Sequence, residues 1–346
     1  MTLKEIAARA GVHVSTVSRV LSSADDSFGS REIRERIWAI AREAGYVPNP
    51  NAQALRQKPK RTLSYRKGTL ACVLARAKSL EDNPFFAHIA RAAEQQALAL
   101  GYSMRAPYSL LEETKPEAAE NSEKALGVIV LGHFAKEEIV RLLENRYQNI
   151  VMVGRAPVKA EWDQIICDGR EAAEIALRHL IGYGHERIGY IGETGQDVSY
   201  LAFRDILREH GIAKEERLIA ECAHNSPEGG YQGADALLRQ AAGRLPTAVF
   251  CRNDVAAIAA IRRFKEEKIK IPERLSLVSL DNIVLSGYAS PMITTVGAPI
   301  TEMGIVAALT LISRVNKLHR SPLKIYLPNR LIARESVGNL NAGMYI

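Results

Sequence analysis

Residues 2–21 have the sequence TLKEIAARAGVHVSTVSRVL, and the architecture of the N-terminal part of the chain follows from this stretch. Apolar side chains recur at helical spacing both before and after Gly11, so we expect two short helices joined by a turn that glycine permits. Such a pair predicts a helix–turn–helix, whose second helix fits the major groove of DNA. A third helix is expected at 30–44.

The outward face of the second helix has side chains suited to contact with DNA. Small hydroxyl groups can reach bases or phosphates, Arg19 can donate two hydrogen bonds to guanine, and Val14 can pack on a thymine methyl group. A plain solvent-exposed helix is the alternative. The candidate DNA contacts in this region are Thr2, Leu3, Val14, Ser15, Thr16, Ser18 and Arg19.

The excess positive charge lies in the same part of the chain. Residues 1–67 hold 13 Lys and Arg against 6 Asp and Glu, and the net charge of all 346 residues is +7, so the remainder is neutral. A basic module on a neutral body favours binding to a polyanion through counterion release. A solvated basic tail is the alternative.

These N-terminal residues resemble the LacI/GalR headpiece. The matching runs are 2–7, 10–12, 15–21 and 45–49. The resemblance implies that Val14 and Ser15 tune operator sequence, while Thr16 and Arg19 make contacts shared across the family. A valine followed by a small residue is similar to the galactose-repressor branch.

Residues 50–56, PNAQALR, resemble the hinge helix of the same family, which is too short to be stable alone. The resemblance implies that two hinge helices of a dimer become ordered on the operator, and that Leu55 wedges into a base step from the minor groove. An apolar contact with the headpiece is the alternative for Leu55. The candidate contacts here are Asn49, Ala52 and Leu55.

From about residue 68, apolar strand patterns alternate with helical patterns, which is typical of parallel α/β units. The expected strands are 70–75, 102–106, 128–131, 150–153, 188–191, 218–222, 248–251 and 275–280. The expected helices are 85–100, 170–181, 200–210, 229–239 and 255–267. This alternation predicts two Rossmann-like lobes of similar size.

The predicted fold class is therefore α/β, with an all-α helix–turn–helix headpiece and a two-lobed core of Rossmann-like parallel sheets. The resemblance extends over this core and implies a periplasmic-binding-protein-like arrangement. We expect a headpiece at 1–48, a hinge helix and linker at 49–67, and an effector-binding and dimerisation domain of two intertwined lobes at 68–346.

Polar side chains follow several of the expected strands. Parallel α/β proteins bind ligands at the carboxyl ends of their strands, and Arg155, Asn253 and Asp281 lie at such positions. Together with an apolar face from Phe85 or Phe86, they suit a polyol. The alternatives are turn or capping roles for Asn253 and Asp281, and core positions for the two phenylalanines.

Two positions depart from the family pattern. The resemblance implies an arginine where this chain has Ser199, and in some relatives a ligand-stacking aromatic near Asn225. We therefore expect no arginine clamp from position 199, and these two residues complete the candidate ligand set. Asp168 is expected to cap the crossover between the lobes. The effector is expected to be a small sugar, and the recognition helix suggests galactose or a galactoside.

Neither catalytic nor metal-binding motifs stand out. The glycines of 189–195, GYIGETG, lack the spacing of a dinucleotide site, and no P-loop, GxSxG or HExxH motif occurs. The four cysteines lie far apart in apolar runs, which predicts reduced core thiols. We expect no cofactor and no metal.

The expected partners are double-stranded operator DNA, a small-molecule effector and a second copy of the chain in a homodimer. No charged leader with an apolar run opens the sequence, and no run of about 18 apolar residues occurs, so a cytoplasmic, nucleoid-associated protein without membrane contact is expected. The alternatives are a non-regulatory sugar-binding protein, a regulator with a non-sugar effector or none, and an enzyme on a Rossmann-like scaffold.

Overall fold

The computed structural model describes residues 2–22, 30–43, 68–75, 79–81, 83–110, 125–132, 137–222, 226–241 and 243–343. The chain divides into two compact units, Met1–Ser64 and Tyr65–Ile346. Within the described segments, no helix is both long enough and apolar enough to cross a membrane.

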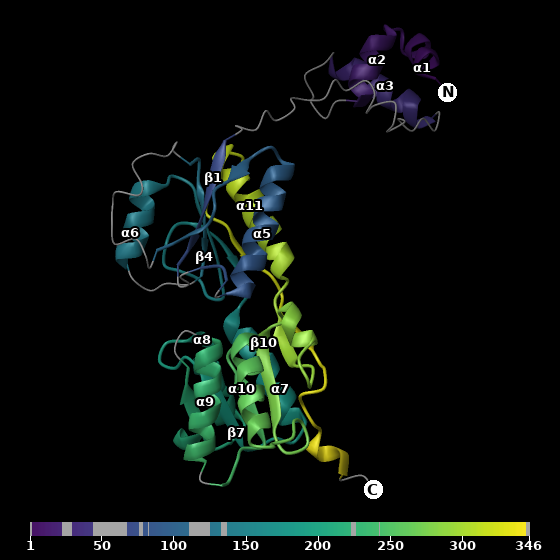
Figure 1. Cartoon of the computed structure of the whole chain (residues 1–346). Helices are drawn as coiled ribbons and strands as arrows, with labels where there is room; N and C mark the ends of the chain where they lie inside the picture. The colour runs from purple at the N-terminus through teal and green to yellow at the C-terminus, as the bar shows by residue number, and fades with distance from the viewer. Residues whose placement is uncertain are drawn as a thin grey trace. The chain divides into compact units, whose positions relative to one another are not determined.

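The described residues of the first unit form the helices α1 (Leu3–Ala10), α2 (Val14–Ser22) and α3 (Arg31–Glu43) (Figure 1). Their inward faces form one apolar cluster, made of Ile6, Ala7, Ala10, Val17, Val20, Leu21, Ile37 and Ala41. Each helix is too short to be stable in isolation, so the shared cluster holds the unit together. The helix–turn–helix expected from residues 2–21 is confirmed.

Local signals set both ends of α1. Thr2 and Glu5 form a capping box, in which Glu5 accepts a hydrogen bond from the Thr2 N–H at 2.8 Å. Gly11 ends the helix in the left-handed region with φ 65°, where its amide N–H returns to the last carbonyls of the helix.

The second unit contains two sheets, each the centre of a lobe. The N-terminal lobe has a parallel sheet in the order β12-β6-β5-β4-β1-β2, with β3 also beside β1. Its strands are β1 (Thr69–Leu74), β2 (Ser103–Met104), β3 (Tyr108–Ser109), β4 (Val128–Leu131), β5 (Ile150–Gly154), β6 (Asp163–Ile166) and β12 (Lys324–Tyr326). Its helices are α5 (Pro84–Ala99), α6 (Glu137–Arg146) and α11 (Ile300–Val315).

The C-terminal lobe has a sheet in the order β13-β11-β10-β9-β7-β8, parallel except for β13. Its strands are β7 (Ile188–Gly192), β8 (Ile219–Glu221), β9 (Ala248–Cys251), β10 (Ser276–Asp281), β11 (Thr294–Gly297) and β13 (Arg330–Ile332). Its helices are α7 (Gly169–Gly182), α8 (Val198–Glu209), α9 (Pro227–Gln240) and α10 (Asp254–Glu266), with short 3₁₀ turns η2 (Glu216–Leu218), η4 (Val284–Gly287) and η5 (Leu340–Gly343).

The chain passes between the lobes three times, after β6, after β11 and after β12. Helix α11 therefore returns to the N-terminal lobe, where it packs along α5 (Figure 1). The two helices approach closely at Gly304, because a Cβ there would overlap the carbonyl oxygen of Ile89. The predicted fold class, with two intertwined parallel α/β lobes, is confirmed.

All the strands and helices expected in the core are present, with ends that differ by a few residues, but the sequence pattern missed several elements. These are α6, α11, β3, β6, β11, β12 and β13. The four cysteines, Cys72, Cys167, Cys222 and Cys251, are buried and free, as expected. The proposed domain boundaries remain predictions, and the hinge segment lies outside the described residues.

Candidate functional site

Helix α2 presents a mixed polar face on the first unit. Ser15 and Arg19 are exposed, whereas Thr16 and Ser18 are half-buried. Val14 is also half-buried, because it packs against the edge of the apolar cluster. The exposed part of this face has one guanidinium and one hydroxyl group, which are suited to base or phosphate contacts.

His13, which sequence reasoning missed, positions the start of α2. Its carbonyl accepts from the N–H of Thr16 at 2.9 Å, and its Nδ1 lies 2.8 Å from Oγ of Ser15. The Ser15 hydroxyl is therefore oriented by a neighbour on the same unit. The sequence could have indicated this role of His13, because the residue before a helix commonly caps it, although histidine is not a favoured capping residue.

The remaining predicted DNA contacts differ in placement. Thr2 is exposed at the capped start of α1, and Leu3 is half-buried on the apolar cluster. Asn49, Ala52 and Leu55 lie outside the described residues, so their roles remain predictions.

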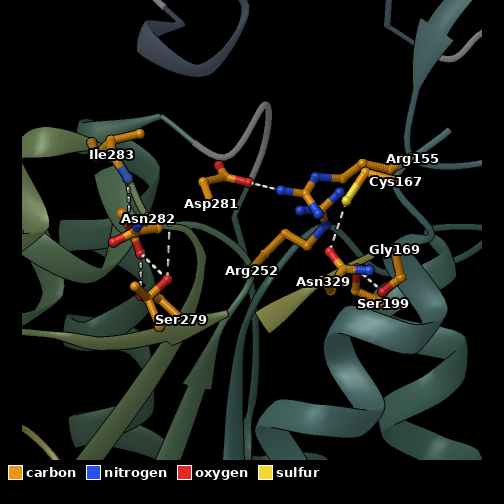
Figure 2. A network of polar contacts seen from close by, with 12 residues as sticks. Arg155, Cys167, Gly169, Ser199, Arg252, Ser279, Asp281, Asn282, Ile283 and Asn329 are labelled. Carbon is orange, nitrogen blue, oxygen red and sulfur yellow. Dashed lines mark hydrogen bonds and ion pairs between the residues drawn. The ribbon is translucent and has the colours of Figure 1, made fainter. Parts of the chain in front are cut away.

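The two lobes meet at an ion pair between Arg155 and Asp281 (Figure 2). Arg155 directly follows β5, and Asp281 is the last residue of β10, so both lie at carboxyl ends of parallel strands. Nη2 of Arg155 donates to Oδ1 of Asp281, and each side chain is only 9% exposed. Strand-end reasoning thus selected two residues, far apart in sequence, that the fold brings together.

The guanidinium of Arg155 is only partly satisfied. Its Nη1 is buried and has no hydrogen-bond partner among the described residues. The guanidinium carbon lies over the Phe85 ring, 4.7 Å from its centre, which is a cation–π contact. A buried donor on a charged group is costly to leave unpaired, so a hydrogen-bond acceptor placed beside this nitrogen would relieve that cost.

The backbone after β10 is unusual. Asp281 has φ 109° and Asn282 has φ 53°, both in the left-handed region that residues other than glycine seldom adopt. Arg334 Nη2 donates to Asn282 Oδ1 at 2.6 Å and supports this turn. Such strain is often found where side chains must be held for function.

Asp254, the first residue of α10, is a second buried carboxyl group close to Asp281. It accepts hydrogen bonds from the hydroxyls of Ser279 and Thr295 and from the N–H of Ile283. Burial, with the nearby charge of Asp281, raises the pKa of Asp254 to about 6 in spite of these donors.

This pKa predicts a specific pH dependence of stability. The folded state binds the Asp254 proton more tightly than the unfolded chain, whose pKa is near 3.8, so this stabilisation is fully present below about pH 4 and is lost as pH rises through 6. At about 1.4 kcal/mol per pKa unit, the loss is on the order of 3 kcal/mol. Urea unfolding at pH 4.5 and 7.5 should show that Asp254→Asn lacks this decline. If the unchanged protein and Asp254→Asn show the same dependence of unfolding free energy on pH, the proposed contribution of Asp254 is wrong.

The other predicted ligand residues have structural contacts. Ser199 is fully buried and its hydroxyl donates to the Gly169 carbonyl at 3.4 Å. The side chain of Asn253 caps α10 by accepting from Ala256 N–H at 2.9 Å. Asp168 caps α7, as expected at this crossover.

The two phenylalanines and Asn225 complete the predicted set. Phe85 is buried in the N-terminal-lobe core and Phe86 is half-buried, with ring centres 5.4 Å apart in an edge-to-face arrangement. Asn225 lies outside the described residues.

An arginine does enter the site, although from a position that the sequence reasoning passed over. Arg252 follows β9 and pairs with Asp197 at 3.0 Å, and its side chain is 12% exposed. Asp197 in turn caps α8 by accepting from the N–H groups of Ser199 and Tyr200. The strand-end rule covers Arg252 as well as it covers Asn253, so the signal was present.

A further contact at the crossovers was missed. Asn329 accepts a hydrogen bond from the Cys167 thiol at 2.9 Å and donates to the Asp168 carbonyl at 2.8 Å. It thereby joins two of the three segments that pass between the lobes. Burial raises the pKa of Cys167 to about 11, which keeps the thiol protonated.

Comparison with known proteins agrees with both units. The lacI family of bacterial regulatory proteins matches residues 2–49, and the periplasmic binding protein-like domain matches residues 177–337. The HTH-type transcriptional regulator DegA of Bacillus subtilis is 31% identical over 350 residues, which cover 98% of this chain and 99% of DegA. The ribose operon repressor of Haemophilus influenzae is 30% identical over 353 residues, with 98% and 99% coverage.

Among solved structures, the transcriptional regulator CelR–cellobiose complex matches with a TM-score of 0.68 and 25% identity, covering 97% of this chain and 99% of CelR. The chain therefore belongs to the LacI family of bacterial regulatory proteins. Its relatives are transcription regulators and not enzymes, and it is accordingly a DNA-binding regulator with a domain for a small ligand.

Proposed function

We propose that this chain is a repressor whose affinity for an operator changes when a small sugar-like ligand binds between its lobes. The observation that carries the proposal is the combination, in one chain, of an exposed α2 face and a buried interlobe pair with an unpaired Arg155 nitrogen. The basic first unit adds the electrostatic attraction to phosphate. A sugar-binding protein without a regulatory role would have no use for such a headpiece.

The proposed ligand site is built around Arg155 and Asp281. Arg155 Nη1 offers a donor beside the carboxylate of Asp281, and a hydroxyl group can satisfy both because it accepts and donates. Two relatives are named for ribose and for a complex with cellobiose, which supports a sugar-like effector. None of the relatives described above is named for galactose, so we propose the class of ligand and not that sugar.

We further propose that the regulator acts as a homodimer in the cytoplasm, because a two-fold operator requires two headpieces. The hinge residues Asn49, Ala52 and Leu55 would then contact the minor groove between the half-sites. Because ligand and operator bind the same protein, any effect of ligand on operator affinity must be matched by an equal effect of operator on ligand affinity.

Replacing Arg19 by Ala tests the DNA-binding part of this proposal. If Arg19 contacts a guanine, the variant loses about 1–3 kcal/mol of binding free energy on its preferred operator. Fluorescence anisotropy with an operator selected from genomic fragments, at physiological salt, measures the loss.

The matched control is Arg208→Ala, which removes an equal charge from a 79% exposed side chain on the second unit. Its operator affinity should stay near that of the unchanged protein. If the two variants bind alike, or if no fragment is preferred by the unchanged protein, the proposed base contact is wrong.

A further inference from the structure

The exposed start of α2 holds a hydroxyl group whose direction is set by a neighbouring side chain. Ser15 is the second residue of α2 and is exposed. In a helix–turn–helix, the N-terminal residues of the second helix contact base edges in the major groove. The Ser15 hydroxyl is therefore placed to contact a base. What it can recognise there depends on whether its hydrogen or its oxygen lone pairs face the DNA.

A serine hydroxyl that rotates freely distinguishes the bases poorly, because it both donates and accepts hydrogen bonds. In the major groove, adenine and cytosine each present an amino group, which donates, whereas guanine and thymine present only acceptor atoms for hydrogen bonding. A free hydroxyl can therefore bond to any of the four bases. A hydroxyl whose hydrogen is already engaged can only accept, so it can bond to adenine or cytosine but not to guanine or thymine.

The ring of His13 engages the hydrogen of the Ser15 hydroxyl. Nδ1 of His13 lies 2.8 Å from Oγ of Ser15 and accepts from the backbone N–H of Ser15 at 3.3 Å. A backbone N–H can only donate, so Nδ1 bears no hydrogen, and the hydrogen of the neutral ring is on Nε2. If Nδ1 did bear a hydrogen, two donors would face each other at this nitrogen. The Ser15 hydroxyl is thus the donor to Nδ1, which leaves only the lone pairs of Oγ for another partner.

Backbone contacts hold the ring and the hydroxyl in this arrangement. The carbonyl oxygen of His13 accepts from the N–H groups of Thr16 at 2.9 Å and of Val17 at 3.3 Å, which fixes His13 to the first turn of α2. Val17 is fully buried in the apolar cluster of the first unit. The side chain before a helix often accepts from the N–H of the second helical residue, as Nδ1 does here. The direction of the Ser15 hydroxyl is therefore set by the folded first unit before DNA binds.

We propose that His13 makes Ser15 a reader of amino groups, so that Ser15 selects adenine or cytosine over guanine or thymine on the strand that it faces. The inference rests on the operator binding of the proposed function and names the class of base that one residue recognises. Opposite guanine or thymine, the Oγ lone pairs would face another acceptor and no hydrogen bond would form. The discrimination should be about threefold to tenfold in operator affinity, the range expected for one hydrogen bond.

A scan of operator base pairs locates the Ser15 contact. The operator selected from genomic fragments is changed one base pair at a time. Fluorescence anisotropy then measures the affinity of each duplex for the full-length protein and for Ser15→Ala. The contacted position is the one whose base preference disappears in Ser15→Ala. If Ser15→Ala has the same base preferences as the unchanged protein at every position, the inference is wrong.

Base analogues at the contacted position show the direction of the hydrogen bond. Each Watson–Crick pair contains one base with an amino group in the major groove, either adenine or cytosine. Deoxynebularine and deoxyzebularine, respectively, replace these two bases with a hydrogen atom in place of the amino group. The analogue should weaken binding of the unchanged protein about threefold to tenfold, and binding of Ser15→Ala by no more than about twofold. An equal effect on the two proteins, or no effect on either, overturns the inference.

Two substitutions of His13 test what sets the direction of the hydroxyl. His13→Asn keeps an acceptor before the helix, where asparagine is a favoured residue, and should keep the sensitivity to the missing amino group. His13→Ala releases the hydroxyl, which can then turn and donate to the remaining acceptors, so the sensitivity should fall below about twofold. His210→Ala is the control, because it removes an exposed histidine from the second unit and should change nothing. Full sensitivity in His13→Ala would contradict the proposed role of His13.

The quantity compared is the ratio of affinities for two duplexes measured with the same protein. A partly unfolded variant binds both duplexes more weakly by the same factor, so its ratio is unchanged. A structural role of His13 alone would likewise weaken binding to every duplex equally. If the unchanged protein prefers no fragment, the proposed operator binding and this inference both fall. A preferred operator without an amino contact that depends on Ser15 contradicts this inference and leaves the proposed function standing.

Discussion

Replacement of Ile37 by Ala is expected to abolish operator binding while leaving the second unit folded. Ile37 is fully buried in the cluster that joins α1, α2 and α3. Truncating a buried isoleucine typically costs about 2–5 kcal/mol, and a small unit whose described helices share one small apolar cluster has little stability in reserve. Hydrogen exchange should show loss of protection at 2–22 and 30–43, with the protection of the second unit unchanged.

Ala39→Ser is the matched control for this prediction. Ala39 lies two residues further along α3 and is exposed, so the change should alter the free energy of unfolding by no more than about 0.5 kcal/mol. If Ile37→Ala retains full operator affinity and protection, the cluster does not maintain the α2 face as inferred.

Replacement of Asp163 by Ala should destabilise the second unit by about 3–5 kcal/mol, because it leaves Arg314 and a backbone N–H in a buried setting without their acceptor. Asp163 is fully buried and accepts from Nε and Nη2 of Arg314, from Nε2 of His319 at 3.0 Å and from the N–H of Leu323 at 2.8 Å. Burial alone would raise its pKa, but these donors lower the pKa below the ordinary value. Urea unfolding at pH 7.5 measures the loss.

An exposed ion pair provides the comparison. Glu137 and Arg141 lie 3.0 Å apart on α6 with side chains 78% and 72% exposed, so Glu137→Ala should cost no more than about 0.5 kcal/mol. A loss for Asp163→Ala as small as that for Glu137→Ala would show that the buried network contributes little. The sign of the Asp163 pKa also predicts that its contribution is lost as pH falls below the ordinary aspartate range.

Strand β6 shows why part of the fold was not predicted. The sequence of β6, DQII, begins with two polar residues, yet Asp163 and Gln164 are fully buried because other groups satisfy them. Asp163 pairs with Arg314, 151 residues further along the chain, and Gln164 exchanges hydrogen bonds with the backbone of Val158 in the preceding loop. An apolar pattern cannot reveal a strand whose polar side chains find partners only in the folded protein.

Helix α11 was not predicted because it has too few polar residues, whereas β6 was not predicted because it begins with two. Its sequence, ITEMGIVAALTLISRV, is apolar over most of its surface, because it lies between α5 and the sheet of the N-terminal lobe. Without a polar face, its helical period is weak in the sequence.

The candidate ligand site also combines features that local sequence indicates with features that only the fold brings together. Arg155 and Asp281 were predicted because each follows a recognisable strand, and the carboxyl ends of parallel strands meet at one edge. The same rule also covers Arg252, which follows β9, but its pairing with Asp197, 55 residues away, could not be read from local sequence because Asp197 caps a different helix.

The sequence by itself determined the headpiece helices, with their caps and turn, and the alternation of strands and helices that makes two lobes. These features depend on residues within a few positions of one another, so hydrophobic spacing, Thr2 and Gly11 were sufficient. Only the tertiary structure decided that Arg155 and Asp281, 126 residues apart, form one buried pair with Arg252 close by. Burial makes such pairing obligatory, and which residues are buried together depends on how the three crossings between the lobes bring distant segments into contact.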